Sequence, residues 1–185
     1  MFILYAVVIG LAVGLLGGGK LAAIADIRFR WAPLVMVGFL AQVLLFSDAV
    51  AARVGDLGPV LYVASTLLVV VAVVRNLAIP GLPLVALGAA SNLVAIVANG
   101  GFMPASPAAL AALGKDVPTI YSNSAVVAQP ALFPLTDVFA LPMWLPFHNI
   151  FSVGDVILAV GVAFVIATAM RRTTGAGRAL RPGGA

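Results

Sequence analysis

The sequence predicts an all-α fold: a polytopic integral membrane helix bundle of about five transmembrane helices with a long extracytoplasmic cap or re-entrant segment. Hydrophobic residues make up 63% of the 185-residue chain, and charged residues only 9%. A soluble domain of that composition would expose apolar patches large enough to cause aggregation. Several apolar runs of about 17 to 25 residues are also long enough to cross a hydrocarbon core as helices.

We expect one transmembrane domain over residues 1–170. The first span has no basic residue before its apolar core, which argues against a cleaved signal peptide. The second begins at Ala32 and Pro33, where a proline in the first turn costs no hydrogen bond. Arg75 and Asn76 form the short connection between the third and fourth spans. The predicted spans are residues 2–19, 32–52, 59–74, 78–98 and 154–170.

The positions of the cations predict the orientation. Those between the first two spans, between the third and fourth, and after the fifth all fall on one side, whereas the other side has only Arg53 and Lys115. We expect the protein to lie in the inner (cytoplasmic) membrane of the cell. The positive-inside rule then predicts that the N-terminus is outside and the C-terminus is in the cytoplasm. The basic tail, residues 171–185, is expected to meet lipid headgroups or a cytoplasmic partner through Arg171, Arg172, Arg178 and Arg181. On a membrane protein such charge indicates orientation and not nucleic-acid binding.

Residues 99–153 form the predicted outer cap. Residues 105–114 predict a short surface helix, with Ser106 as the N-cap and Gly114 as the stop. Prolines recur from 118 to 146 and exclude a long helix, yet the residues between them are largely apolar. We therefore expect the segment to lie in the interface, with Trp144 at headgroup level, or to re-enter the bundle. The sequence leaves both options open for residues 117–150.

Small and polar residues inside the spans predict helix packing. Gly10 and Gly14 form a G-x-x-x-G face that allows close approach between helices, and through which copies of the chain could also associate. Gln42 and Asn92 are expected to form interhelical hydrogen bonds. No ionisable residue falls near the middle of a predicted span, which disfavours a proton-driven transporter.

The polar residues that precede the last span are the candidate site. Asp155 falls in the first turn of that helix, where Ser152 and Asp155 would form a capping-box-like pair. Asp137 and His148 are either loop groups facing water or part of a site with Asp155. Two carboxylates that share a site cannot easily both ionise, and a split pair of pKa values suits acid and base catalysis on water. No metal or cofactor is expected, because the chain has one histidine and no cysteine.

Three short segments around these residues resemble the catalytic end of the lipoprotein signal peptidase family. They are residues 137–139, residues 147–149, and Asp155 with Gly161 six residues later. The resemblance implies an aspartyl peptidase with Asp137 and Asp155 as its catalytic residues. Asn149 stands six residues before Asp155, where that family has three, and no G-N-x-x-D-R motif precedes Asp137.

A second resemblance spans nearly the whole chain. It is carried by residues 17–21, 28–31, 99–104 and 151–161, which read GGGKL, RFRW, NGGFMP and FSVGDVILAVG. These segments resemble a family of small bacterial multi-pass membrane proteins catalogued only as a domain of unknown function. The resemblance implies the same fold and the outer location of the polar motifs, and it implies no activity.

Three functions remain open; the sequence leaves enzymatic activity undecided and favours the first, which is not enzymatic. The first is a non-enzymatic component of a larger membrane complex or homo-oligomer that binds partner proteins or membrane lipids, with Asn99, Phe102, Trp144 and Asn149 as binding residues. The second is a small-solute or lipid carrier or pore, with a polar path past Gln42, Thr66 or Asn92. The third is an outer-leaflet hydrolase of the aspartyl type that uses Asp137, Asp155 and His148.

Overall fold

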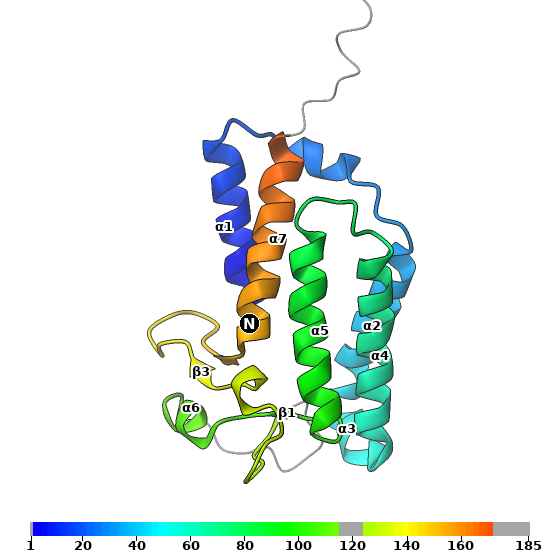
Figure 1. Cartoon of the computed structure of the whole chain (residues 1–185), viewed down its shortest axis with the longest axis vertical. Coiled ribbons are helices and arrows are strands. Elements are labelled where there is room, and N and C mark those ends of the chain that lie inside the picture. The colour runs from blue at the N-terminus through cyan, green and yellow to red at the C-terminus, as the bar shows by residue number, and fades with distance from the viewer. Residues whose placement is uncertain (1, 115–123, 172–185) are drawn as a thin grey trace, which may run out of the picture.

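The computed structural model describes residues 2–114 and 124–171, and that part of the chain is mostly helical (Figure 1). Its helices are α1 (Ile3–Leu16), the 3-10 helix η1 (Leu21–Asp26), α2 (Ala32–Leu45), α3 (Asp48–Val54), α4 (Leu57–Val74), α5 (Leu82–Ala98), α6 (Pro107–Ala111), the 3-10 helix η2 (Phe133–Leu135) and α7 (Val153–Arg171). Four two-residue strands complete it: β1 (Met103–Pro104), β2 (Ser124–Ala125), β3 (Phe139–Ala140) and β4 (Ile150–Phe151).

Two of the described helices, α4 and α7, are long and apolar enough to cross a membrane. The pair α2 and α3 would make a third span if the two count as one broken helix. The helices α1 and α5 are also apolar but have only 14 and 17 residues. The structure is therefore compatible with a membrane protein, whereas the predicted number of five spans is not confirmed.

The predicted second span, residues 32–52, is wrong as one continuous helix. α2 ends at Leu45, and α3 begins at Asp48 after a bend of 81°. Ser47 adopts an extended backbone at the break, and its hydroxyl donates to the Leu44 carbonyl at 2.6 Å. Asp48 then lies in the first turn of α3, where an acidic side chain is favoured by the helix dipole. The Ser-Asp pair is thus a helix-start signal inside an apolar run.

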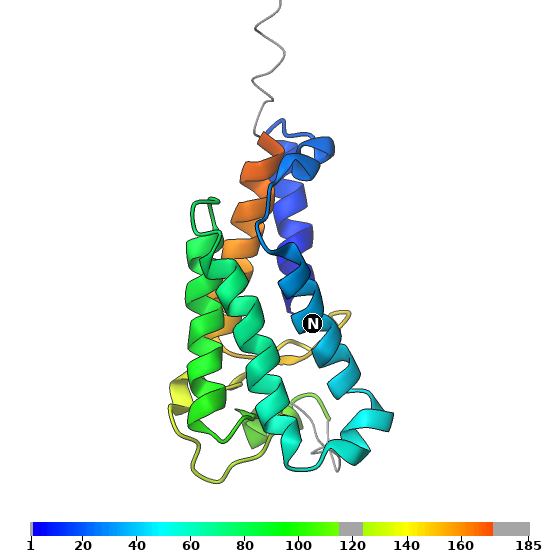
Figure 2. The ribbon, with the colours of Figure 1, turned by 90° about the vertical axis from the view of Figure 1, so that its right-hand side faces the viewer.

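The long helices pack in the order α1, α7, α5, α4, α2 (Figures 1 and 2). Glycines bring neighbouring backbones together: Gly10 lies against Ala163 between α1 and α7, and Gly88 lies against Gly154 between α5 and α7. Because α2 packs mainly on α4, it has no extensive contact with α7. The bundle is therefore an open row of helices and not a closed ring.

The two halves of the bundle are staggered along their axes. Gly161 of α7 contacts Gly81 at the start of α5, while Gly154, near the start of α7, contacts Gly88 in the middle of α5. The remaining length of α5, residues 89–98, extends about 15 Å beyond the start of α7. The segment around η2 packs there against both helices. Part of residues 99–153 thus packs beside the far end of α5.

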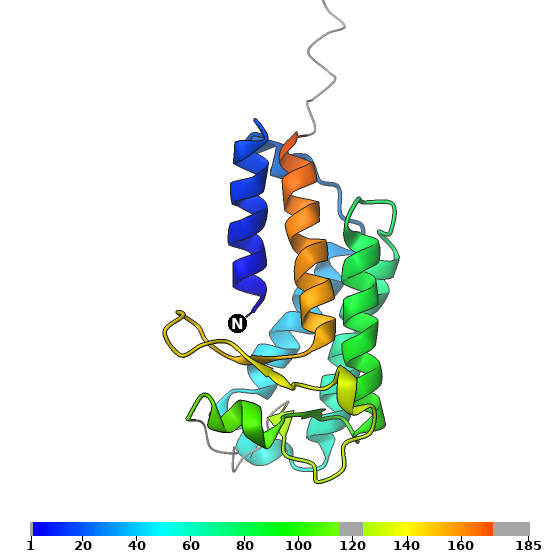
Figure 3. The ribbon, with the colours of Figure 1, turned by 60° about the vertical axis from the view of Figure 1, so that its left-hand side comes forward.

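The cap is built from short strand pairs. β1 pairs with β2 in parallel, Ala105 forms a further parallel bridge with Asp137, and β3 pairs with β4 as an antiparallel hairpin (Figure 3). The predicted surface helix is shorter than expected, since α6 ends at Ala111 and does not reach Gly114. The Ser106 side chain also makes no capping bond. Residues 124–151 contain no α-helix, as the prolines predict. Part of the proline-rich region, residues 115–123, lies outside the described residues.

The end of the bundle opposite the cap, called the basic end below, carries most of the described cations. These are Lys20, Arg28, Arg30, Arg75 and Arg171, whereas Arg53 lies at the cap end on α3. Arg75 stacks over the Trp31 ring at 5.8 Å from its centroid. The Asn76 side chain bonds the backbone of Arg30 and so fixes the incoming chain to the end of α4.

Candidate functional site

Asp155 is held by the start of its own helix. Its backbone N–H donates to Ser152 Oγ at 3.1 Å, and the Ser152 backbone N–H donates to Asp155 Oδ2 at 2.9 Å. These are the reciprocal bonds of a capping box, predicted from the sequence, with Asp in the place of Glu. Ser152 is fully buried. The start of α7 is therefore a fixed platform for this carboxylate.

A second helix fixes the other carboxylate oxygen. Asn92 Nδ2, on α5, donates to Asp155 Oδ1 at 2.8 Å, and Ser152 Oγ lies 2.9 Å from Asn92 Oδ1. Gly154 makes this arrangement possible, because a side chain there would collide with Asn92 Oδ1. Asn92 was predicted to serve helix packing, and its role in orienting Asp155 could not be inferred without knowing which residue it faces.

Asp137 reaches the same region from the cap. Its backbone N–H donates to the Pro104 carbonyl at 3.0 Å, and its carbonyl accepts from the Ser106 N–H at 2.9 Å. The main chain is thus fixed by the strand that continues β1. The side chain is only 7% exposed and forms no hydrogen bond or ion pair with any described residue. Loss of hydration, with a further contribution from the negative charge of Asp155, raises the pKa of Asp137 from 3.8 to about 7.

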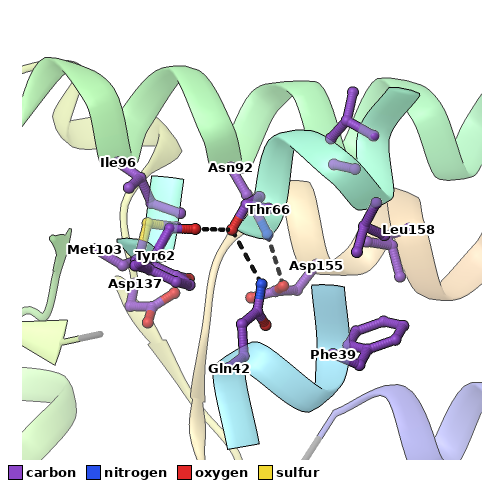
Figure 4. A pocket seen from close by; sticks show the side chains of 13 residues that line it. Phe39, Gln42, Tyr62, Thr66, Asn92, Ile96, Met103, Asp137, Asp155 and Leu158 are labelled. Atoms are coloured by element: carbon purple, nitrogen blue, oxygen red, sulfur yellow. Dashed lines mark hydrogen bonds between the residues drawn. The ribbon is translucent and has the colours of Figure 1, made fainter. Parts of the chain in front are cut away.

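The two carboxylates line the same two cavities. The bundle cavity, of about 190 Å³, lies between α2, α4, α5 and α7, and the cap cavity, of about 230 Å³, lies beside the start of α1 and β4. Asp137, Asp155 and Leu158 belong to the walls of both. Figure 4 shows the bundle cavity with side chains from all four helices and from the cap around it. Sequence separation therefore does not keep the carboxylates apart.

The bundle cavity runs along the helices. On α5 it is lined by Ala89, Asn92 and Ile96, which lie on successive turns over about 10 Å. Phe39 on α2, which is 54% exposed, and Leu158 on α7 also belong to its wall. α2 and α7 both line the cavity and have no extensive contact with each other, and we call the interval between them the slot. Toward the basic end it gives way to the buried cluster of Val73, Leu82 and Val85.

His148 is not brought to the carboxylates. It is half-buried in the loop of the β3–β4 hairpin, where its Nδ1 lies 3.2 Å from the Leu145 carbonyl oxygen, and it lines neither cavity. Its neighbour Asn149 does line the cap cavity. Within residues 2–114 and 124–171, no group of three metal-ligating side chains occurs.

The other predicted binding residues have different surroundings. Asn99 donates to and accepts from the backbone of Ala131, both at 2.9 Å, and so fixes the cap to the end of α5. Phe102 is half-buried. Trp144 is 80% exposed near the turn of the β3–β4 hairpin, and Tyr5 donates a hydrogen bond to Pro146 in the same turn.

The residues predicted for helix packing lie between helices. Gly10 and Gly14 are buried against α7, so this face is used for packing within one chain. Gln42 joins α2 to α4 by donating to Thr66 Oγ1 at 3.1 Å, and both residues line the bundle cavity. Arg171 donates to the Val13 carbonyl at 3.0 Å. The predicted headgroup residues Arg172, Arg178 and Arg181 lie outside the described residues.

Comparison with known proteins identifies a family without a known activity. A model of a family of unknown function, DUF5317, matches residues 26–167, and the chain belongs to that family. No curated protein and no solved structure matches it. The matched segment includes Asp137, Asp155 and every other residue that lines the bundle cavity.

Proposed function

We propose that this member of a family of unknown function is a membrane-embedded hydrolase that uses Asp137 and Asp155 as a pair of carboxylates. The observation that carries the proposal is their shared position on the walls of two cavities, with one carboxyl held by hydrogen bonds and the other buried without one among the described residues. Such asymmetry separates the protonation states of two neighbouring acids, which water-activating carboxylate pairs require.

The surroundings suggest a role for each carboxyl group. Asp155 is oriented by Asn92 and Ser152 and would act as the base that takes a proton from water while the water oxygen attacks a carbonyl carbon. Asp137 has a pKa raised to about 7 and would donate its proton to the carbonyl oxygen. Collapse of the tetrahedral intermediate breaks the bond to the leaving group, which takes up the proton held by Asp155. A hydroxyl of the intermediate returns its proton to Asp137, so both carboxyl groups regain their starting states.

In this role the cap would lie outside and the basic end in the cytoplasm of a bacterial cell, with the bundle in the inner membrane. The supporting observation is the distribution of cations, since among the described residues only Arg53 lies at the cap end. In this orientation the carboxylate pair faces the outer leaflet. Exposed Trp144 would then lie near the lipid headgroups.

The other two functions remain predictions. A partner-binding or lipid-binding component does not require Asp137 to be buried beside a second carboxylate. A carrier or pore agrees with a cavity that touches Gln42, Thr66 and Asn92. It also requires a continuation toward the basic end, where the lining gives way to the cluster of Val73, Leu82 and Val85. The hydrolase therefore accounts for more of the geometry.

Comparison of protein N-termini in membranes tests this function. Cells that express the wild type would be compared with cells that express Asp137→Asn or Asp155→Asn at the same level, using mass spectrometry of labelled N-termini. Asp48→Asn, an exposed acid at the cap end, is the matched control. We expect one set of N-termini to disappear in both site variants and to persist in the control. Identical N-termini, and identical released lipid products, in all four strains would rule out the hydrolase.

A further inference from the structure

Carboxamide side chains clamp backbone peptide groups at both ends of this molecule. At the basic end, Asn76 Oδ1 accepts from the Arg30 N–H at 2.8 Å, and its Nδ2 donates to the Arg30 carbonyl at 2.7 Å. At the cap end, Asn99 holds Ala131 through the same pair of bonds. A primary amide matches a peptide backbone because each presents one donor and one acceptor to the other.

The Gln42 carboxamide presents a similar donor and acceptor, called the amide edge below, which no described residue occupies. Its Nε2 donates to Thr66 Oγ1, and the Thr66 hydroxyl donates in turn to the Tyr62 carbonyl at 2.8 Å. Because that hydroxyl hydrogen is already used, Thr66 can only accept from Gln42, and this fixes which amide atom is the nitrogen. The Gln42 oxygen and its second N–H form no hydrogen bond with the described residues.

That edge lies in the wall of the bundle cavity, together with Asp137 and Asp155 (Figure 4). Phe39, one turn before Gln42 on α2, and Leu158 on α7 line the same cavity. A chain entering through the slot from a lipid bilayer would leave water behind. Its polar groups would then need partners on the walls, because an unpaired peptide group in such surroundings costs several kcal/mol.

We propose that Gln42 clamps the backbone of a polypeptide segment that enters between α2 and α7, so that the substrate of the carboxylate pair is a peptide. The substrate assignment rests on the proposed hydrolase, whereas binding at Gln42 does not. A hydrocarbon chain from a lipid offers neither a donor nor an acceptor to the amide edge. A peptide offers both, and it would approach the carboxylates with its backbone aligned.

Binding of a defined probe tests the clamp. The probe is a synthetic apolar peptide in which one peptide bond is replaced by a non-hydrolysable hydroxyethylene group. A second version carries one backbone ester in place of an amide and so lacks one N–H, and affinity is measured by fluorescence with purified full-length protein in detergent. We expect Gln42→Leu to weaken binding of the amide probe ~10-fold, the effect of one or two lost hydrogen bonds. Probes with the ester at different positions are compared. In the wild type, one ester position should weaken binding relative to the amide probe, and in Gln42→Leu the same ester should cause no further loss of affinity.

Thr66→Val separates recognition from packing. It removes the same hydrogen bond between α2 and α4 but keeps the Gln42 amide, so it should lower stability as Gln42→Leu does and weaken probe binding less than Gln42→Leu. Equal affinities of the wild type and Gln42→Leu for the amide probe, or no binding to the wild type, would overturn the clamp. The clamp would also be overturned if the protein retained a phospholipid more strongly than the peptide probe when vesicles of that lipid compete with the probe. A different result would separate the two proposals. If Asp137→Asn cleaves the same proteins as the wild type while Gln42→Leu still loses affinity for the probe, the hydrolase is wrong and the clamp stands.

Discussion

Asn92 Nδ2 lies 2.8 Å from Asp155 Oδ1, in a hydrogen bond that joins the middle of α5 to the first turn of α7. The bond exists because Gly88 and Gly154 let the two helices approach closely at this level. One side chain therefore couples the packing of the bundle to the orientation of a candidate catalytic carboxylate. This relationship leads to the first two predictions.

Replacing Asn92 with Leu should lower both stability and activity. The change removes the hydrogen bond to Asp155 and the Asn92 oxygen that accepts from the Ser152 hydroxyl, at a cost of about 1–3 kcal/mol. Thermal unfolding in detergent measures the first effect, and the N-terminal comparison measures the second. Ser91→Ala, at a half-buried polar neighbour on the same helix, is the control and should behave like the wild type.

Adding a methyl group at Gly154 should separate α5 from α7. The new Cβ in Gly154→Ala would collide with Asn92 Oδ1 and meet the Gly88 carbonyl oxygen at 3.0 Å. Overpacking of this kind costs typically about 1–3 kcal/mol. The thermal midpoint in detergent should fall, whereas Val156→Ala, at an exposed position two residues further along α7, should change it little. Equal midpoints for Gly154→Ala and the wild type would contradict the described helix contact.

Removal of the Asn76 side chain should loosen the basic end. Asn76 is buried and forms hydrogen bonds with the Arg30 N–H, the Arg30 carbonyl and the Ala72 carbonyl. In Asn76→Ala the two Arg30 groups lose their partner, which we expect to cost about 2–3 kcal/mol. Limited proteolysis between α1 and α2 should become faster. Asn99→Ala provides the comparison at the cap end, where cleavage is expected near Ala131 instead.

Asp137 should make stability depend on pH in a defined direction. Its pKa is raised from 3.8 to about 7 on folding, so between these values the folded chain binds a proton that the unfolded chain has lost. The stabilisation is fully present below about pH 4 and is lost as the pH rises to about 7, on the order of 4 kcal/mol in total. Asp137→Asn should flatten this part of the stability curve. An unchanged curve would show that Asp137 does not titrate in this range.

The sequence allowed prediction of the helical class, the start of the last helix and the capping pair of Ser152 and Asp155, because these depend on local patterns. It did not allow prediction of the break at Ser47, since an apolar run on both sides masks a two-residue helix-start signal. The short strands of the cap were also missed, because each has only two residues and pairs with distant segments.

At the candidate site, the sequence indicated the two aspartates but not their surroundings. Asn92 and Gln42 were predicted as helix-packing residues, which describes their hydrogen bonds between helices and not the cavity that both line. His148 was included because of its residue type, yet its ring faces the Leu145 carbonyl in a loop. Only the relative placement of α2, α5 and α7 distinguishes these cases, and no local pattern encodes it.

The most direct test of the carboxylate pair is labelling with a hydrophobic carbodiimide, which reacts with protonated buried carboxyl groups. Purified protein would be labelled across a pH series and the modification of Asp137 followed by mass spectrometry, for the wild type and for Asp155→Asn. We predict labelling that declines around pH 7 in the wild type and at a lower pH in Asp155→Asn, because the variant lacks the negative charge that helps to raise the Asp137 pKa. Labelling that declines at the same pH in both proteins would show that the two carboxylates do not form one site.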